Sequence, residues 1–423
     1  MTCFSSWLRR PTAKEPVQRP TERERPALPS TQFALTLFEG LKPGHHNLVM
    51  SPYGARVVLS MLWEGSTGET RKELAEALRL DEDPHNPANH YERLGRPLGF
   101  QLELEQARRT LDILTACAVW CDDGFVPRPE YVAAVTSHFL ADVRTLDFRA
   151  PQSADIVNRW VGEKTRGKIS KVVTSLERSS PLMTMNAVYF KGLWQAPFDP
   201  ADTQEDVFTL QDGTTTRVPL MDQRGSFQYA EHGGAQIVAL PYKGEMSMRV
   251  VLPPPDMPFP AFCAELTRTV GTNWTRGMAS RDGHVRLPRF RITTQADLKG
   301  PLMAMGMPQV FDPARATLDG ISDRKPLYLM AAMQAGFVEV NETGTEAAAL
   351  TTLEEGACMI QVPQPPFEMI INRPFVFAIC DDLSDVVVFL GAVVDPLAGQ
   401  RPDGCRDSDT QSGPEPRGAG RGH

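Results

Sequence analysis

Thiol and imidazole groups are the side chains of this sequence that could act as nucleophiles, bases or metal ligands. The chain has seven cysteines and eight histidines, so a Cys–His dyad is available by composition, but no local signature marks one. His45 and His46 are adjacent in a Pro-Gly turn, where neighbouring residues rarely converge on one ion. We therefore expect free thiols and no metal site. The cysteines, none in a CxxC pair, are Cys3, Cys117, Cys121, Cys263, Cys358, Cys380 and Cys405.

The recurrent motifs of catalytic and nucleotide-binding sites are absent from the sequence. We find no HExxH, GxSxG, GxGxxG or Walker A pattern. The stretch from Gly65 to Gly68 has the composition of a phosphate-binding loop, but it lacks the lysine that would reach the phosphates. A turn between helices is the simpler interpretation. Catalysis receives no support, and we expect no cofactor.

The segment 342–352 combines small side chains with an alternation that could serve strand addition. Read with the strand period of two, Thr345, Ala347, Ala349 and Thr351 share one face, and all four are small. Such a face could enter a crowded gap in a sheet without steric or desolvation cost. Its alanine content is also compatible with a helix. The segment reads Glu342, Thr343, Gly344, Thr345, Glu346, Ala347, Ala348, Ala349, Leu350, Thr351, Thr352.

Helical periodicity dominates the first half of the chain. Apolar residues recur at helical spacing from Phe33 to Leu41, after a candidate cap at Ser30 or Thr31. Ser51 followed by Pro52 predicts the start of a second helix, because proline at the first helical position loses no hydrogen bond. Thr67 is a candidate cap for a third helix. A fourth contains residues 156–161, and residues 296–307 return to a helical pattern.

Strand patterns dominate the second half. Residues 237–252 predict a hairpin broken at 243–245, and residues 375–394 predict another with its turn at 381–385. Residues 182–191 and 337–340 predict further strands. Helices early and antiparallel strands late indicate an α+β fold rather than a doubly wound sheet.

Both ends of the chain differ in composition from the middle. Residues 1–29 and 397–423 are rich in Pro, Gly, Arg and Asp, which predicts disordered tails around one domain at 30–396. The N-terminus lacks the long apolar stretch of a secretory signal, so we expect a cytoplasmic protein, with an extracellular location as the alternative. The net charge of -8 provides no basic stripe for nucleic acid, and no apolar run is long enough to span a membrane.

Several motifs, in order along residues 30–396, resemble those of the serpins, the serine protease inhibitor family. The segment 342–352 is similar to the hinge of a serpin reactive-centre loop, and the chain resembles a prokaryotic-type, inhibitory member. The other matching segments are 47–52 (NLVMSP), 65–70 (GSTGET), 158–161 (NRWV), 186–194 (NAVYFKGLW), 240–244 (LPYKG), 287–290 (LPRF) and 373–375 (RPF).

This resemblance implies a fold and a site. The implied fold has three β-sheets, a central five-stranded sheet, eight to nine helices and an exposed reactive-centre loop at about 342–366. Ser51, Asn186, Gln334 and Trp194 would lie where the central sheet opens to admit the loop. The implied activity is that of a suicide substrate, whose cleaved loop inserts into the central sheet while a protease remains attached.

The family spacing from Glu342 places the scissile bond between Cys358 and Met359. A neutral Cys358 would suit an uncharged specificity pocket of moderate size. The implied target is a serine protease of chymotrypsin-like, elastase-like or subtilisin-like preference, or a cysteine protease. We expect a monomer that binds neither nucleic acid nor membrane.

Three residues depart from the family pattern. Gly54 replaces a serine in the early Ser-Pro-x-Ser motif, Gln334 replaces a histidine, and Glu355 puts a carboxylate on the face that would insert. Gly54 and Gln334 would rewire the hydrogen bonds beneath the opening sheet. The alternative is therefore a non-inhibitory serpin that acts as a binding or chaperone-like protein.

Overall fold

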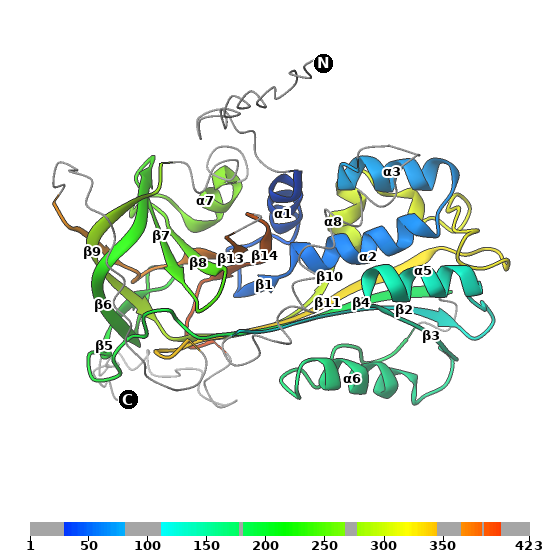
Figure 1. Cartoon of the computed structure of the whole chain (residues 1–423), viewed down its shortest axis with the longest axis horizontal. Coiled ribbons are helices and arrows are strands. Elements are labelled where there is room, and N and C mark those ends of the chain that lie inside the picture. Colours follow the sequence, from blue (N-terminus) through cyan, green and yellow to red (C-terminus); the bar gives the residue numbers. More distant parts are fainter. Residues whose placement is uncertain are drawn as a thin grey trace, which may run out of the picture.

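A five-stranded sheet runs along the length of the molecule and organises the rest of the fold (Figure 1). The computed structural model describes residues 29–80, 111–176, 181–266, 277–344, 365–382 and 385–398. The sheet has the order β10 (Phe290–Asp297), β11 (Leu329–Val340), β4 (Leu182–Gly192), β2 (Leu111–Asp122) and β3 (Asp142–Leu146). The adjacent strands β11 and β4 are parallel. Of the other three pairs, β10–β11 and β4–β2 are antiparallel and β2–β3 is parallel.

The remaining strands form one nine-stranded sheet rather than two separate sheets. The prediction of three sheets differs from the structure here because β6 is 18 residues long. Its first part pairs with β5 and its last part with β7, so hydrogen bonds continue from one end to the other. The order is β1 (Leu48–Met50), β14 (Val387–Val393), β13 (Phe375–Asp381), β8 (Met246–Leu252), β7 (Ala235–Pro241), β6 (Thr215–His232), β9 (Ala279–Pro288) and β12 (Phe367–Ile370), with β5 (Gln204–Thr209) beside β6.

Helices cover both faces of the five-stranded sheet (Figure 1). On one face, α6 (Ser153–Lys164) buries Trp160 edge-on against Trp120 of β2, with 6.0 Å between the ring centroids. Most of the other helices lie on the opposite side of the sheet. The described α-helices number seven, against eight to nine expected for the whole chain: α1 (Pro29–Gly40), α2 (Pro52–Glu64), α3 (Gly68–Leu78), α5 (Pro129–Phe139), α6, α7 (Phe259–Glu265) and α8 (Lys299–Ala304).

The predicted start of α2 is confirmed, but the other two predicted caps differ from the structure. α1 begins at Pro29, which suits the first turn of a helix, so the candidate caps Ser30 and Thr31 lie inside α1. Ser51 caps α2, and its hydroxyl accepts a hydrogen bond from the backbone N–H of Gly54 at 3.0 Å. Thr67 occupies the N-cap position of α3, but its side chain makes no capping hydrogen bond. The helix predicted at 296–307 is shorter, because residues 296 and 297 complete β10 and Gly306, at φ +93°, follows the end of α8.

Both predicted hairpins are present. β7 and β8 pair antiparallel around residues 242–245. β13 and β14 also pair antiparallel. The strand predicted at 337–340 starts earlier, at Leu329, because the parallel pairing with β4 extends the ladder. Among the described residues, no helix combines the length and apolar character needed to cross a bilayer.

Candidate functional site

The parallel strands β4 and β11 meet at a seam inside the five-stranded sheet, next to the predicted hinge. The two strands pair directly, with Gln334 opposite Asn186 and Phe337 opposite Tyr189. Immediately after β11 the chain reaches Glu342, the first residue of the predicted hinge. An inserted strand would therefore have to separate these partners, and the contacts across the seam oppose its opening.

Gln334 lies at the centre of a buried hydrogen-bond network beneath the seam. Its amide oxygen accepts the backbone N–H of Ser51 at 2.8 Å. Its amide nitrogen donates to the carbonyl of Ser51 at 2.9 Å and to Oδ1 of Asn186 at 2.7 Å. The side chain is almost completely buried, so these three bonds satisfy polar groups that water cannot reach.

Ser51 and Asn186 extend this network to three further elements. The Ser51 hydroxyl donates to the carbonyl of Val388 in β14 at 2.7 Å and accepts the N–H that caps α2. The Asn186 amide nitrogen donates to the carbonyl of Ala116 at 3.2 Å and lies 3.3 Å from the sulfur of Cys117. The two sheets and α2 are thus joined at one buried point.

Gly54 leaves room for this arrangement. A Cβ atom placed on Gly54 would lie 2.2 Å from Oδ1 and 2.6 Å from the side-chain nitrogen of Asn186. A serine at 54 would therefore require Asn186 to move away from its bond with Gln334. Two of the three departures from the family pattern therefore meet at one side chain, because Gly54 and Gln334 both contact Asn186.

Trp194 occupies the end of the seam nearest the hinge. Its ring stacks on Tyr242, with centroids 4.3 Å apart and an interplanar angle of 8°. Its indole nitrogen donates to the carbonyl of Asn341 at 2.9 Å, and its backbone N–H donates to the carbonyl of Thr343 at 3.2 Å. Trp194 thereby holds the chain as it leaves β11.

Glu342 is the anchored first residue of the hinge. Its side chain is 7% exposed. The carboxylate accepts a 2.6 Å hydrogen bond from the hydroxyl of Thr203 and forms an ion pair with Arg289. Burial by itself would raise the pKa of Glu342, but the hydrogen bonds from Thr203 and Arg289 outweigh it, so this pKa lies below its ordinary value. Glu342 is therefore a charged fixed point at the base of the hinge.

Gly344 has a backbone conformation that requires glycine. Its φ is +90°, and an added Cβ would lie 2.2 Å from the carbonyl oxygen of Gly192. Thr343 is held by Oδ1 of Asn341, which accepts from its N–H at 3.2 Å and its hydroxyl at 2.9 Å. The other predicted site residues, Thr345, Glu346, Ala347, Ala348, Ala349, Cys358 and Met359, as well as Glu355, lie outside the described residues.

Aromatic contacts across the seam were not predicted from the sequence. Tyr189 of β4 stacks on Phe337 of β11, with centroids 5.8 Å apart and the rings tilted by 10°. Lys168 and Arg291 lie over the Phe337 ring at 5.5 and 5.1 Å. No sequence pattern indicates this stack, because its two rings come from strands about 150 residues apart whose register only the fold sets.

Arg289 and Thr203 also carry roles that sequence reasoning did not assign. Both stand in or beside segments that match the family. The turn from β9 into β10 brings Arg289 to Glu342, and Thr203 reaches Glu342 from the residue before β5. The four described cysteines, Cys117, Cys121, Cys263 and Cys380, are buried thiols outside any disulfide. Burial raises the pKa of each thiol to about 12, so none of these four is a ready nucleophile.

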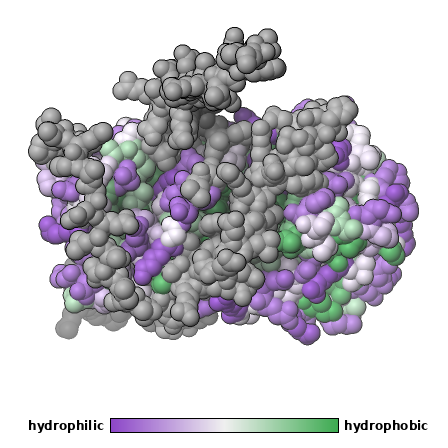
Figure 2. Space-filling model, in the orientation of Figure 1, coloured by the Kyte–Doolittle hydropathy of each residue, from purple (hydrophilic) through white to green (hydrophobic). Residues whose placement is uncertain are grey.

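The described surface offers little continuous apolar area. In Figure 2, hydrophilic residues predominate among the described residues of the visible face, and hydrophobic ones form smaller patches. The large apolar side chains exposed among the described residues come from separate segments: Val126, Leu140, Val207 and Met303.

Sequence comparisons place this fold and site in a known class. The family model for serpins, the serine protease inhibitors, matches residues 29–396. Plasminogen activator inhibitor 1 of Neovison vison is 31% identical over 379 residues, which cover 87% of this chain and 92% of that protein. Glia-derived nexin of Rattus norvegicus is 32% identical over 364 residues, 83% of this chain and 88% of its own. The chain belongs to the serpin family.

Solved structures agree with this assignment. The structure of mouse protein-Z dependent protease inhibitor superposes with a TM-score of 0.76 at 26% identity and covers 87% of this chain and 96% of its own. The structure of native tengpin, a thermophilic serpin, has a TM-score of 0.75 at 24% identity. The match covers 87% of this chain and 93% of tengpin. Thyroxine-binding globulin also shares the fold, with a TM-score of 0.74 at 22% identity. The match covers 87% of this chain and 98% of the globulin. The fold is thus shared by a protein named as a protease inhibitor and by one named as a thyroxine-binding globulin.

Proposed function

We propose that this serpin inhibits a protease as a suicide substrate. The protease nucleophile attacks the carbonyl of Cys358, and the amine of Met359 leaves, which produces an acyl-enzyme and a cut loop. The segment from Gly344 to Thr352 then enters the sheet between β4 and β11 while the acyl bond persists. The bond-breaking groups all belong to the protease.

The observation that carries this proposal is the direct parallel pairing of β4 with β11 next to the hinge. A chain that leaves the end of β11 and turns back into the seam runs antiparallel to both neighbours. Insertion would therefore replace one parallel ladder by two antiparallel ladders, which are slightly more stable per residue and double the number of interstrand hydrogen bonds. This gain is available only after cleavage releases the loop.

Small residues on the inserting face support the same proposal. Thr345, Ala347, Ala349 and Thr351 would point to one face of the sheet and add little volume there. The relatives named plasminogen activator inhibitor 1 are, by their name, inhibitors. A neutral Cys358 favours proteases of chymotrypsin-like, elastase-like or subtilisin-like preference, or a cysteine protease.

Adduct formation tests the proposal. The protein is incubated with chymotrypsin, pancreatic elastase, subtilisin and papain, and the products are separated on denaturing gels. We expect a covalent adduct with at least one protease, and mass spectrometry of the released fragment should begin at Met359 or within two residues of it. Complete cleavage without adduct for every protease would overturn the proposal and favour a non-inhibitory binding or chaperone-like serpin.

A charge on the inserting face should convert the inhibitor into a substrate. We expect Thr345→Arg to be cleaved at the normal rate but to form less than about a tenth of the wild-type adduct, because burial of an unpaired guanidinium opposes insertion. The matched control is Glu346→Arg, which puts the same side chain on the next residue and therefore on the opposite face of the strand. Equal adduct yields from the two variants would contradict insertion of this segment.

A further inference from the structure

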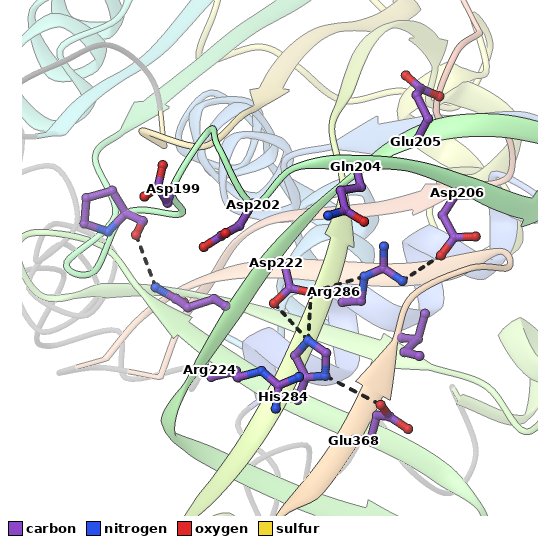
Figure 3. A pocket seen from close by; sticks show the side chains of 13 residues that line it. Asp199, Asp202, Gln204, Glu205, Asp206, Asp222, Arg224, His284, Arg286 and Glu368 are labelled. Carbon is purple, nitrogen blue, oxygen red and sulfur yellow. Dashed lines mark hydrogen bonds and ion pairs between the residues drawn. The ribbon is translucent and has the colours of Figure 1, made fainter.

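Four neighbouring strands, β5, β6, β9 and β12, form one hollowed face at the end of the nine-stranded sheet. The pocket on this face has a volume of about 840 Å³ (Figure 3). It is lined by residues of the four strands and of the segment 197–203, which leads into β5 and which we call the acidic wall. The pocket lies outside the seam described above.

A ladder of ion pairs joins the strands that line the pocket. Asp206 of β5 binds Nη1 of Arg286 in β9 at 2.6 Å, and Nε of Arg286 lies 3.4 Å from Asp222 of β6. The ring of His284 lies between Asp222 and Glu368 of β12, with Nε2 2.8 Å from one carboxylate and Nδ1 3.5 Å from the other (Figure 3). These contacts cross all four strands, so they hold the lining of the pocket in place.

The pocket has more negative than positive charge. Six carboxylates and two guanidinium groups line it, so the excess remains whichever protonation state His284 adopts. Three of these carboxylates, Asp199, Asp202 and Glu205, are exposed and form no ion pair with a described residue. Arg224 lies outside the ladder and offsets one of the three. A cation in the pocket would therefore meet carboxylates that have no positively charged partner of their own.

The unpaired carboxylates are spread along the pocket rather than gathered at one point. Figure 3 shows Glu205 well apart from Asp199 and Asp202. A compact ion such as Mg²⁺ or Ca²⁺ needs several oxygen ligands around one point. Among the described residues, the one group of three acidic side chains close enough to share an ion lies elsewhere, at 122, 123 and 147. The pocket therefore suits an extended cation, whose charges are separated, better than a metal ion.

The acidic wall also contacts the base of the predicted hinge. Thr203, which follows Asp202, donates its hydroxyl to the carboxylate of Glu342 at 2.6 Å. The backbone N–H of Phe198, which precedes Asp199, donates to the carbonyl of Glu342 at 2.9 Å. A ligand that restrains the acidic wall thus also restrains its two contacts with Glu342.

We propose that this pocket binds a small linear polyamine, whose ammonium groups pair with Asp199, Asp202 and Glu205. Methylene groups separate the charges of such a molecule, and Pro197 and Ile370 offer them apolar surface. The ligand bridges the acidic wall and β5, and it thereby stabilises the wall beside the hinge. Binding is independent of the proposed inhibitory function, whereas its effect on loop insertion rests on that function.

Isothermal titration calorimetry with spermidine tests the site directly. At pH 7 and low salt we expect one spermidine to bind per chain with a Kd below about 1 mM, because several exposed ion pairs form together. Mg²⁺ and acetylated, amidated trilysine are the comparisons, since they carry their charge on a compact ion and on a peptide backbone. Both should bind more weakly. Absence of saturable spermidine binding, or equal or tighter binding of either comparison, would overturn the proposal.

Paired substitutions separate the site from the general attraction of an acidic chain. In the double variant Asp202→Asn, Glu205→Gln, we expect the Kd for spermidine to rise about three- to twentyfold, because two exposed ion pairs are lost. The control Glu130→Gln, Asp155→Asn removes the same charge from exposed positions on α5 and α6 and should bind as wild type. Melting curves verify that both variants are folded. Equal affinities of the two variants would show that net charge alone attracts spermidine, and the pocket assignment would fail.

Incorporation of a synthetic loop peptide gives the functional readout. With spermidine at about four times its Kd, a peptide with the sequence of residues 345–356 should enter the sheet up to about fivefold more slowly, the limit reached when the open form binds no ligand. The Asp202→Asn, Glu205→Gln variant at the same spermidine concentration should show a smaller effect. Unchanged entry despite binding would refute the link to the hinge.

The two proposals can fail separately. If spermidine binds but no protease forms an adduct, the proposed function fails and the pocket assignment stands. If a protease forms an adduct but spermidine does not bind, the pocket assignment alone fails.

Discussion

Single residues explain how the site tolerates departures from the family pattern. Gln334 stands where the resemblance implies a histidine, yet its amide group makes three hydrogen bonds to Ser51 and Asn186. An amide both donates and accepts regardless of pH, whereas a histidine would change its bonding with protonation. The absence of a side chain at Gly54 gives Asn186 the space this geometry needs. The rewired network is complete rather than impaired.

The buried ion pair of Glu342 with Arg289 allows a prediction for a single side chain. Glu342→Gln removes the charged partner of Arg289 but leaves the hydrogen bond from Thr203 available. We expect a loss of about 1–3 kcal/mol in the free energy of unfolding at pH 7, because Arg289 is 41% exposed and water can solvate it after the change. The matched control is Glu339→Gln, near the end of β11, whose ion pair with Lys168 is partly exposed and 3.9 Å long.

The pH dependence of this effect follows from the depressed pKa of Glu342. A carboxyl with a folded pKa below its ordinary value of 4.5 stabilises the fold fully above that value and loses the stabilisation as the pH falls through the folded pKa. Melting curves of wild type and Glu342→Gln should therefore differ by a constant amount from pH 8 to pH 5 and converge in stronger acid. A difference that grew on acidification would contradict the assignment.

Elements decide how readily the seam opens. β4 and β11 are held together by their ladder, by the buried network at Gln334 and by the stack of Tyr189 on Phe337. These contacts occur at successive heights along the two strands, and the stack lies closer to the hinge. A strand that enters from the hinge would therefore break the stack before it reaches the network.

Removal of the stack should speed insertion. In Phe337→Leu, we expect a synthetic peptide with the sequence of residues 345–356 to enter the sheet about two- to tenfold faster, since an aromatic pair contributes about 0.5–1.5 kcal/mol beyond its buried area. Native gels and thermal melting follow the incorporation. Phe262→Leu, in α7, controls for loss of a buried ring away from the seam. Equal rates for the two variants would show that the stack does not limit opening.

The proposed function requires that the intact molecule as a whole be less stable than the cleaved one. Cleavage within the predicted loop should free residues 344–352 to become a sixth strand of the central sheet, with ladders on both sides. We expect the cleaved protein to melt at a temperature higher by more than about 10 °C than the intact protein. Differential scanning calorimetry of intact, cleaved wild-type and cleaved Thr345→Arg protein measures this. Identical melting temperatures of intact and cleaved wild type would exclude a metastable native fold.

Local signals in the sequence predicted several elements and the class of this protein. The start of α2 at Ser51 and Pro52, the two hairpins and the motif around Asn186 to Trp194 were all predicted, because capping, proline geometry and alternation act between near neighbours in the chain. The small residues of the hinge likewise indicated strand addition without any coordinates.

Contacts between distant segments were decided by the tertiary structure alone. Gln334 meets Ser51 across 283 residues, Glu342 meets Arg289 across 53, and His284 meets Glu368 only because β9 and β12 pair in parallel. A one-residue change of register would turn each of these side chains to the opposite face. The sequence therefore indicated the segment that we propose to insert, and the packing of the two sheets decided which side chains hold β4 and β11 together.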